Sequence, residues 1–167
     1  MEEVFDIVNI NDEVIGSAKR SEVHGNPSLI HRVAHVLIFN TKGELFLQKR
    51  SMSKDVQPGK WDTSVGGHLD AGESYQDAAL REMKEELGIA PEKIEFLYKY
   101  CHSNDYETEY VSTFFGSWNG IIWMNKDEIE EGRFWKIDEI ESNSMDTQFT
   151  PNFLDELERY KKHTLSN

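Results

Sequence analysis

Runs of apolar residues, broken by short polar turns, predict two β-hairpins in the first third of the chain. The first hairpin pairs Phe5–Asn9 with Val14–Arg20, and the second pairs Val33–Asn40 with Glu44–Arg50. A polar loop then covers residues 51–60. The same pattern predicts further strands at Trp61–Val65, Ile94–Cys101 and Glu109–Trp118.

A helical repeat of apolar positions appears at Ser74–Leu87 and again at Thr150–His163. Ser74 and Asp77 have the spacing of a capping box, and Gly88 is a typical stop for the first helix. One face of that helix is apolar and must pack on a core; its members are Ala79, Leu80, Met83 and Leu87. Strands interleaved with a few helices indicate the α/β class, with a mixed β-sheet between helical layers.

The length of 167 residues suits one domain, 1–167, in which residues 1–32 form an N-terminal hairpin extension and linker to the core. No run reaches the roughly 20 apolar residues of a membrane span. The acidic start and the lone Cys101 favour a cytoplasmic setting with no membrane partner. A net charge of −13 argues against a nucleic acid polymer as partner, although a bound cation can still attract phosphate to clustered carboxylates.

Three glutamates lie close together on a second face of the first predicted helix. Glu82, Glu85 and Glu86 are three and four positions apart, so their carboxylates crowd one another. Mg²⁺ would relieve that repulsion, because it prefers oxygen ligands. A glutamate-rich helix face alone is more often a solvated surface. The spacing of the surrounding residues therefore decides between the two interpretations.

The segment 67–89 resembles the signature of the Nudix family at every position: Gly67, five residues, Glu73, seven residues, Arg81-Glu82, Met83, one residue, Glu85-Glu86, one residue, Gly88-Ile89. A chance match is expected about once in 10⁹ registers. The resemblance implies a Nudix-type α/β/α sandwich in which Glu82, Glu85 and Glu86 bind Mg²⁺ or Mn²⁺ with help from a backbone carbonyl near Gly66 or Gly67. It also implies an Arg81–Glu73 pair that holds the loop on the helix, and attack by water on a small-molecule diphosphate.

A broader resemblance links the chain to type-1 isopentenyl-diphosphate isomerases, a branch of the same family. It is carried by His31-Arg32, Phe39-Asn40, Gln48-Lys49-Arg50, Ser53-Lys54, Pro58-Gly59-Lys60-Trp61 and Gly67-His68. Those isomerases hold a metal with three histidines and two glutamates, which implies a second site for Mn²⁺ or Zn²⁺ here. The matching residues are His24, His31, His68, Glu107 and Glu109. Arg50 and Lys54 match residues that contact the diphosphate.

One departure favours hydrolysis over isomerisation. The catalytic cysteine of the isomerases falls at Gly66, which has no side chain to move a proton, and the Nudix signature is complete here. The chain is therefore predicted to be a metal-dependent diphosphohydrolase of a nucleoside-diphosphate type of substrate. The alternatives are an isopentenyl-diphosphate isomerase and a noncatalytic ligand-sensing module.

The water-activating base is sought among acidic residues around the predicted metal ions. Glu109 is our choice, ahead of Glu82, Glu85 and Glu107. Acids at 127–131 are also candidates, although a role in capping a short helix is preferred for them. The family resemblance allows a homodimer.

Overall fold

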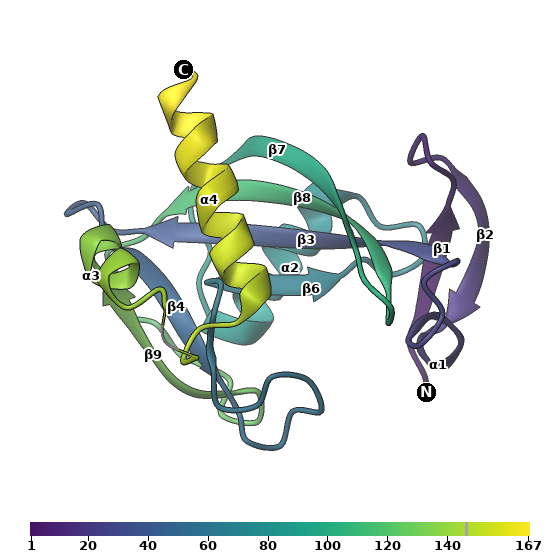
Figure 1. Cartoon of the computed structure of the whole chain (residues 1–167), viewed down its shortest axis with the longest axis horizontal. Helices are drawn as coiled ribbons and strands as arrows, with labels where there is room; N and C mark the ends of the chain where they lie inside the picture. The colour runs from purple at the N-terminus through teal and green to yellow at the C-terminus, as the bar shows by residue number, and fades with distance from the viewer. Residues whose placement is uncertain (146) are drawn as a thin grey trace.

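The computed structural model describes residues 1–145 and 147–167, and within those ranges it contains nine strands and four helices (Figure 1). The strands are β1 (Val4–Val8), β2 (Val14–Lys19), β3 (Ile30–Phe39), β4 (Leu45–Arg50), β5 (Trp61–Asp62), β6 (Val65–His68), β7 (Ile94–Ser103), β8 (Thr108–Ser117) and β9 (Ile129–Trp135). The helices are α1 (Arg20–Val23), α2 (Tyr75–Leu87), α3 (Ile137–Ser142) and α4 (Pro151–Leu165).

Strand β3 is the centre of a branched, mixed sheet. It pairs in parallel with β8 along its whole length, and in antiparallel with β6 through Val33–Val36. It meets β4 only at Phe39 and Leu45. From that point β4 and its partner β9 diverge from β3, so the sheet forks (Figure 1). The residues on β6 therefore lie at an edge that no further strand covers within the described residues.

Helices cover both faces of the sheet, which confirms the predicted α/β/α sandwich. Successive side chains of β3 point to opposite faces. Ala34, Val36 and Ile38 pack with α2 in one core. Leu37 and Phe39 pack with α4 in the other core. In Figure 1, α4 crosses in front of the sheet and α2 lies behind it.

Helix α2 begins and ends close to the predicted positions. Its N-cap is Ser74, whose hydroxyl accepts a hydrogen bond from the Asp77 amide at 3.1 Å. Its C-cap is Gly88 with φ of 61°, a left-handed conformation that favours glycine. Leu80 was wrongly assigned to the apolar stripe, because its side chain is 40% exposed. Ala78 is buried in its place, and its small side chain lets the helix approach the sheet closely.

Several weakly patterned elements differ from the prediction. The strand predicted at 61–65 is two strands, β5 and β6, and the second continues through the glycines at 66 and 67. Residues 127–131, predicted to cap a short helix, lead instead into β9, which pairs with β4. Strand β9 forms because the edge of β4 is available for pairing. The exposed acids at 130 and 131 interrupt the apolar pattern that would predict a strand in the sequence. Helix α3 was not predicted.

The N-terminal hairpin forms as predicted and sits at one end of the sheet (Figure 1). It is attached to β3 through the Val8–Ile30 pair and has its own small apolar cluster of Phe5, Ile7 and Val23. The limits of this extension, 1–32, stay a prediction. None of the helices among the described residues is long and apolar enough to cross a membrane.

Candidate metal centre and active site

Two of the three signature glutamates are packed against the uncovered edge of β6. Glu86 is only 5% exposed and accepts hydrogen bonds from Gln48 Nε2 at 3.0 Å and from the Gly66 amide at 3.4 Å. The carboxyl group of Glu82 lies against Gly67, where an added Cβ would overlap with it. Glycine at 67 is therefore required for this close approach. Glu85 is different, because 58% of its side chain is exposed.

Burial makes these carboxylates costly to ionise. It raises the pKa of Glu82 to about 7, and the charges of Glu85 and Glu128 add to that rise, although Arg81 opposes it. Burial also raises the pKa of Glu86 well above its usual value, and the charge of Glu82 adds to the effect. Glu128 is the acid of the 127–131 group that acts on both carboxylates. A divalent cation at this place would supply the missing positive charge.

Arg81 fixes the loop before α2 to the helix. Its Nε and Nη2 donate to the two carboxylate oxygens of Glu73 at 2.8 and 2.9 Å, and Nη2 also donates to the His68 carbonyl at 3.0 Å. Its Nη1 donates to Glu82 at 2.6 Å and to Glu85 at 3.2 Å. The guanidinium thus connects the loop, the helix and the end of β6.

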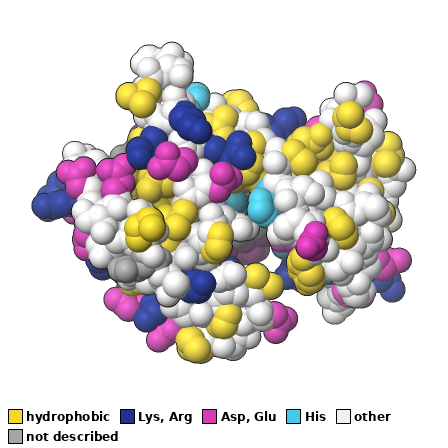
Figure 2. Space-filling view, viewed as in Figure 1, with side chains coloured by type: hydrophobic (Ala, Val, Ile, Leu, Met, Phe, Trp, Pro, Cys, Tyr) yellow, Lys and Arg dark blue, Asp and Glu magenta, His cyan; other side chains and the backbone are white. Residues whose placement is uncertain are grey.

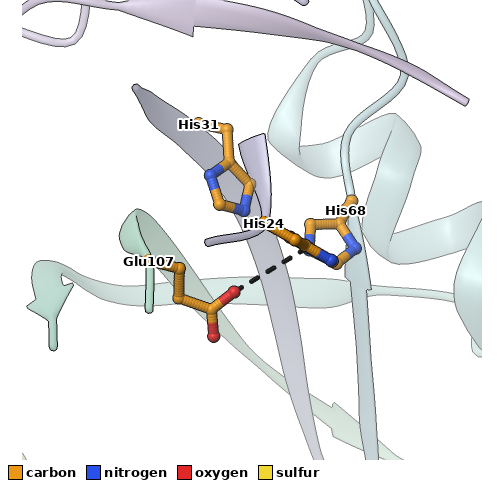
Figure 3. A group of neighbouring side chains, drawn as sticks. All are labelled: His24, His31, His68 and Glu107. Carbon is orange, nitrogen blue, oxygen red and sulfur yellow. Dashed lines mark hydrogen bonds and ion pairs between the residues drawn. The ribbon is translucent and has the colours of Figure 1, made fainter. Parts of the chain in front are cut away.

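A second cluster gathers three histidines and a glutamate from four parts of the chain (Figure 3). One potential ligand atom from each of His24, His31, His68 and Glu107 lies within 4.8 Å of all the others. Glu109 joins them, since its Oε1 is 3.2 Å from His31 Nε2 and 3.6 Å from His68 Nε2. The sheet explains this convergence, because His31 pairs with Glu109 across β3 and β8. All five residues predicted for the second site are brought together.

The imidazole of His31 is the clearest sign that this cluster suits a metal ion. It is completely buried, and both ring nitrogens lack a hydrogen-bond partner among the described residues. The short distance from Nε2 to Glu109 does not have hydrogen-bond geometry. A buried nitrogen without a partner costs about 1–3 kcal/mol, and coordination would remove that penalty. Phe5 stacks on the His68 ring at 4.7 Å between centroids and closes one side of the cluster.

Burial and neighbouring charges shift the pKa values of His24, Glu107 and Glu109. Burial lowers the pKa of His24 to about 4, and the neighbouring His68 contributes to the shift. Burial raises the pKa of Glu107 to about 7, helped by the charge of Glu109. For Glu109, burial raises the pKa, but His31 and His68 outweigh it and leave the pKa lowered. A carboxylate held between two imidazoles suits a ligand better than a base, because a low pKa weakens proton acceptance.

Both basic residues predicted to bind substrate lie where β4 ends, and both contact acids. Arg50 Nη1 is 3.3 Å from Asp62 Oδ2, and Lys54 Nζ is 3.3 Å from Glu128 Oε2. Lys54 therefore approaches the signature glutamates through Glu128. Figure 2 shows histidine side chains in a depression between the N-terminal hairpin and the rest of the molecule.

Some residues around these sites were not predicted to take part. Gln48 contacts Glu86 directly and falls within a segment that carries the isomerase resemblance, so a signal for it existed. His35 and Glu156 lie 121 positions apart in the sequence and form a hydrogen-bonded pair beside β6, in which Glu156 is buried and His35 partly buried. No local pattern in the sequence could have revealed that pair.

Comparison with known proteins identifies the family of this fold. A model of the NUDIX domain matches residues 29–157. An uncharacterised Nudix hydrolase of Pseudomonas aeruginosa is 32% identical over 153 residues, covering 92% of this chain and 90% of the relative. Isopentenyl-diphosphate Delta-isomerase 2 of Photorhabdus laumondii is 34% identical over 135 residues, covering 78% and 76%. The chain belongs to the Nudix family, whose members generally act on pyrophosphate bonds.

Solved structures show the same fold. A crystal structure from Deinococcus radiodurans has a TM-score of 0.82 at 23% identity, covering 94% of this chain and 98% of the other. The NUDIX domain of Shewanella oneidensis NrtR, complexed with ADP ribose, has a TM-score of 0.64 at 15% identity, covering 80% and 87%. At these identities the likeness concerns the fold alone.

The raised pKa of Glu82 predicts how Mg²⁺ binding depends on pH. Below about pH 7 the carboxyl is protonated, so a cation must displace a proton, and affinity should fall by up to about tenfold per pH unit. We expect the rise in Tm on adding Mg²⁺ to be larger above pH 7 than below it. Glu82→Gln should reduce this dependence, and Glu86, whose pKa is also raised, accounts for the part that remains. An equal rise at both pH values in the unsubstituted protein would contradict the prediction.

Proposed function

We propose that the chain is a divalent-metal-dependent hydrolase that cuts the diphosphate linkage of a small organic molecule of the nucleoside-diphosphate type. The observation that carries this function is the buried carboxylate of Glu86 beside the partly buried carboxylate of Glu82 at the edge of β6. Arg81 offsets the charge of Glu82, but no cationic side chain pairs with Glu86 among the described residues. Two adjacent carboxylates, one buried and one partly buried, fit a hard cation, and diphosphate oxygens are ligands that such a cation prefers.

In this function, Glu82, Glu85, Glu86 and the carbonyl of Gly67 hold Mg²⁺ or Mn²⁺. The bound cation supplies charge neutralisation for the phosphoryl oxygens and activation of water. Arg50 and Lys54 orient the diphosphate, and each exchanges its present acidic partner for substrate oxygens. Glu73 and Arg81 keep the loop in place, so that the backbone at Gly66 and Gly67 stays beside the glutamates.

We further propose that His24, His31, His68, Glu107 and Glu109 hold a second ion, Mn²⁺ or Zn²⁺. The lack of a hydrogen bond at either ring nitrogen of the buried His31 supports this assignment, as does the mixture of imidazole and carboxylate donors. This site is connected to the first through β6, since His68 ends the strand that contains Gly66 and Gly67.

Replacing one buried ligand should separate catalysis from stability. We expect Glu86→Gln to reduce turnover by about 10²-fold or more, because the loss of a fixed charge at the reacting phosphoryl group is costly. Gln keeps the shape and can still accept from Gln48 and the Gly66 amide, so Tm should not fall. Glu92→Gln, an exposed carboxylate outside the site, is the matched control. Product release from a panel of diphosphates that includes ADP-ribose is measured with Mg²⁺ and with Mn²⁺.

Unchanged turnover in Glu86→Gln would reject the assignment of this carboxylate. Tight binding of a diphosphate without hydrolysis by the unsubstituted protein would instead support the ligand-sensing alternative.

The second metal site can be tested by metal content. His24→Gln should lower the amount of Mn²⁺ or Zn²⁺ that the protein retains after dialysis, because the substitution removes an imidazole ligand whose side chain is only 17% exposed. His102→Gln, outside the cluster, should retain as much metal as the unsubstituted protein. Elemental analysis gives the stoichiometry. Equal metal content in the two variants would remove the case for the site.

The isomerase alternative is favoured by the histidine cluster and by relatives that carry that name. It is opposed by Gly66, where an added Cβ would lie 3.0 Å from His35 Cδ2. We expect no dimethylallyl diphosphate after incubation with isopentenyl diphosphate, because one proton-transfer group is missing. Nuclear magnetic resonance of the reaction mixture detects either isomer, and appearance of the dimethylallyl product would reverse the ranking.

A further inference from the structure

A third buried carboxylate, remote from the signature helix, lies beneath the same part of the sheet. Glu156 of α4 is fully buried and accepts hydrogen bonds from His35 Nδ1 at 3.0 Å and from the hydroxyls of Tyr98 and Tyr100. These donors come from β3 and β7, so three elements converge on one carboxylate. Burying a charge costs free energy unless it is fully hydrogen-bonded, and an apolar residue would fill this core more simply. The network therefore invites a functional explanation.

The hydrogen bond to Glu156 fixes the direction of the His35 ring. Since Nδ1 faces α4, the opposite edge of the ring faces β6, with Cδ2 and Nε2 at 3.0 and 3.3 Å from the ideal Cβ position of Gly66. Among the described residues, Nε2 has no hydrogen-bond partner. About 16% of the side chain remains exposed. The histidine thus presents one unused nitrogen to the space above Gly66.

The surroundings of His35 favour a proton on both ring nitrogens. Burial alone lowers its pKa, but the hydrogen bond and charge of Glu156 outweigh burial, and Asp62 and Glu109 act in the same direction, so the pKa is raised. The pKa of Glu156 is lowered, because His35 and the two tyrosines together outweigh its burial. Nε2 is therefore supplied with a proton to donate. Such a donor repels a metal ion and attracts an anion.

Gly66 connects this donor with the signature glutamates. The amide of Gly66 is 3.4 Å from Glu86 Oε2, while the Cβ position of the same residue meets the His35 ring. A phosphoryl group held by a cation on Glu82 and Glu86 would then lie next to Gly66. The nearby cations Arg50 and Lys54 already contact Asp62 and Glu128. His35 Nε2 is therefore a donor that could bind a phosphoryl oxygen without first losing a partner.

We propose that His35 is a substrate-binding residue whose Nε2–H donates to a non-bridging oxygen of the diphosphate, with Glu156 as the positioning residue that orients the ring. This role rests on the proposed hydrolase function. It also explains the glycine at 66, because a side chain there would cover the donating edge of His35.

Binding of methylenediphosphonate in the presence of Mg²⁺, measured by calorimetry, tests the role of His35. His35→Gln should weaken binding by about tenfold, the usual effect of one charge-assisted hydrogen bond. Binding of Mg²⁺ alone should not change. His102→Gln is the matched control and should bind the probe like the unsubstituted protein. Equal affinity in His35→Gln and the unsubstituted protein would overturn the role of His35.

A double-substitution cycle distinguishes positioning from a merely structural effect. If Glu156 acts through His35, Glu156→Gln should weaken probe binding on its own but add nothing in the His35→Gln background. Additive losses would overturn the positioning role. If Glu156→Gln does not fold, Tyr98→Phe replaces it, because this substitution leaves the His35–Glu156 hydrogen bond intact. Tyr98→Phe should bind the probe as the unsubstituted protein does. Weaker binding would contradict the role of the His35–Glu156 pair. Failure of the unsubstituted protein to bind the probe would reject the hydrolase function as well.

Discussion

The close approach of α2 to the uncovered edge of β6 is the constraint on which the candidate active site depends. Apolar contacts of Ala79, Met83 and Leu87 with the sheet hold the helix there, and glycine at 67 leaves the space that the carboxyl group of Glu82 occupies. The same approach takes Glu82 and Glu86 out of water, at an electrostatic cost of several kcal/mol per ion if both are charged. Packing and electrostatics therefore oppose each other unless a proton or a cation neutralises the pair.

Arg81 offsets part of the electrostatic cost of packing α2 against β6 before any ion binds. Its guanidinium offsets part of the charge on Glu82 while its other nitrogens hold Glu73 and the carbonyl of His68. Because His68 also belongs to the histidine cluster, a single side chain links the geometry of the two candidate metal sites.

The sequence was sufficient where structure and chemistry follow from local spacing. The helix bearing Glu82, Glu85 and Glu86 has its cap, its apolar stripe and its stop within a short segment, so its bounds were predicted closely. Strand β9 could not be predicted, because it exists as the partner of β4 rather than through its own pattern. In the sequence, Glu156 is one of several charged residues in the predicted helix at Thr150–His163. Its burial depends on donors from β3 and β7 that only the folded chain brings to it.

The role of Gly66 depends on the residue opposite it in the sheet. His35 and Gly66 are direct partners in the β3–β6 register, so the space above this pair admits a side chain from one strand or from the other, but not from both without displacement. In the resembling isomerases a cysteine would occupy that space from the β6 side. Here the imidazole occupies it from β3, and a thiol that could transfer a proton to carbon is replaced by a fixed donor suited to oxyanions. Glycine at 66 thus accounts for the missing isomerase group, and it leaves open the edge of His35 that we propose to bind the diphosphate.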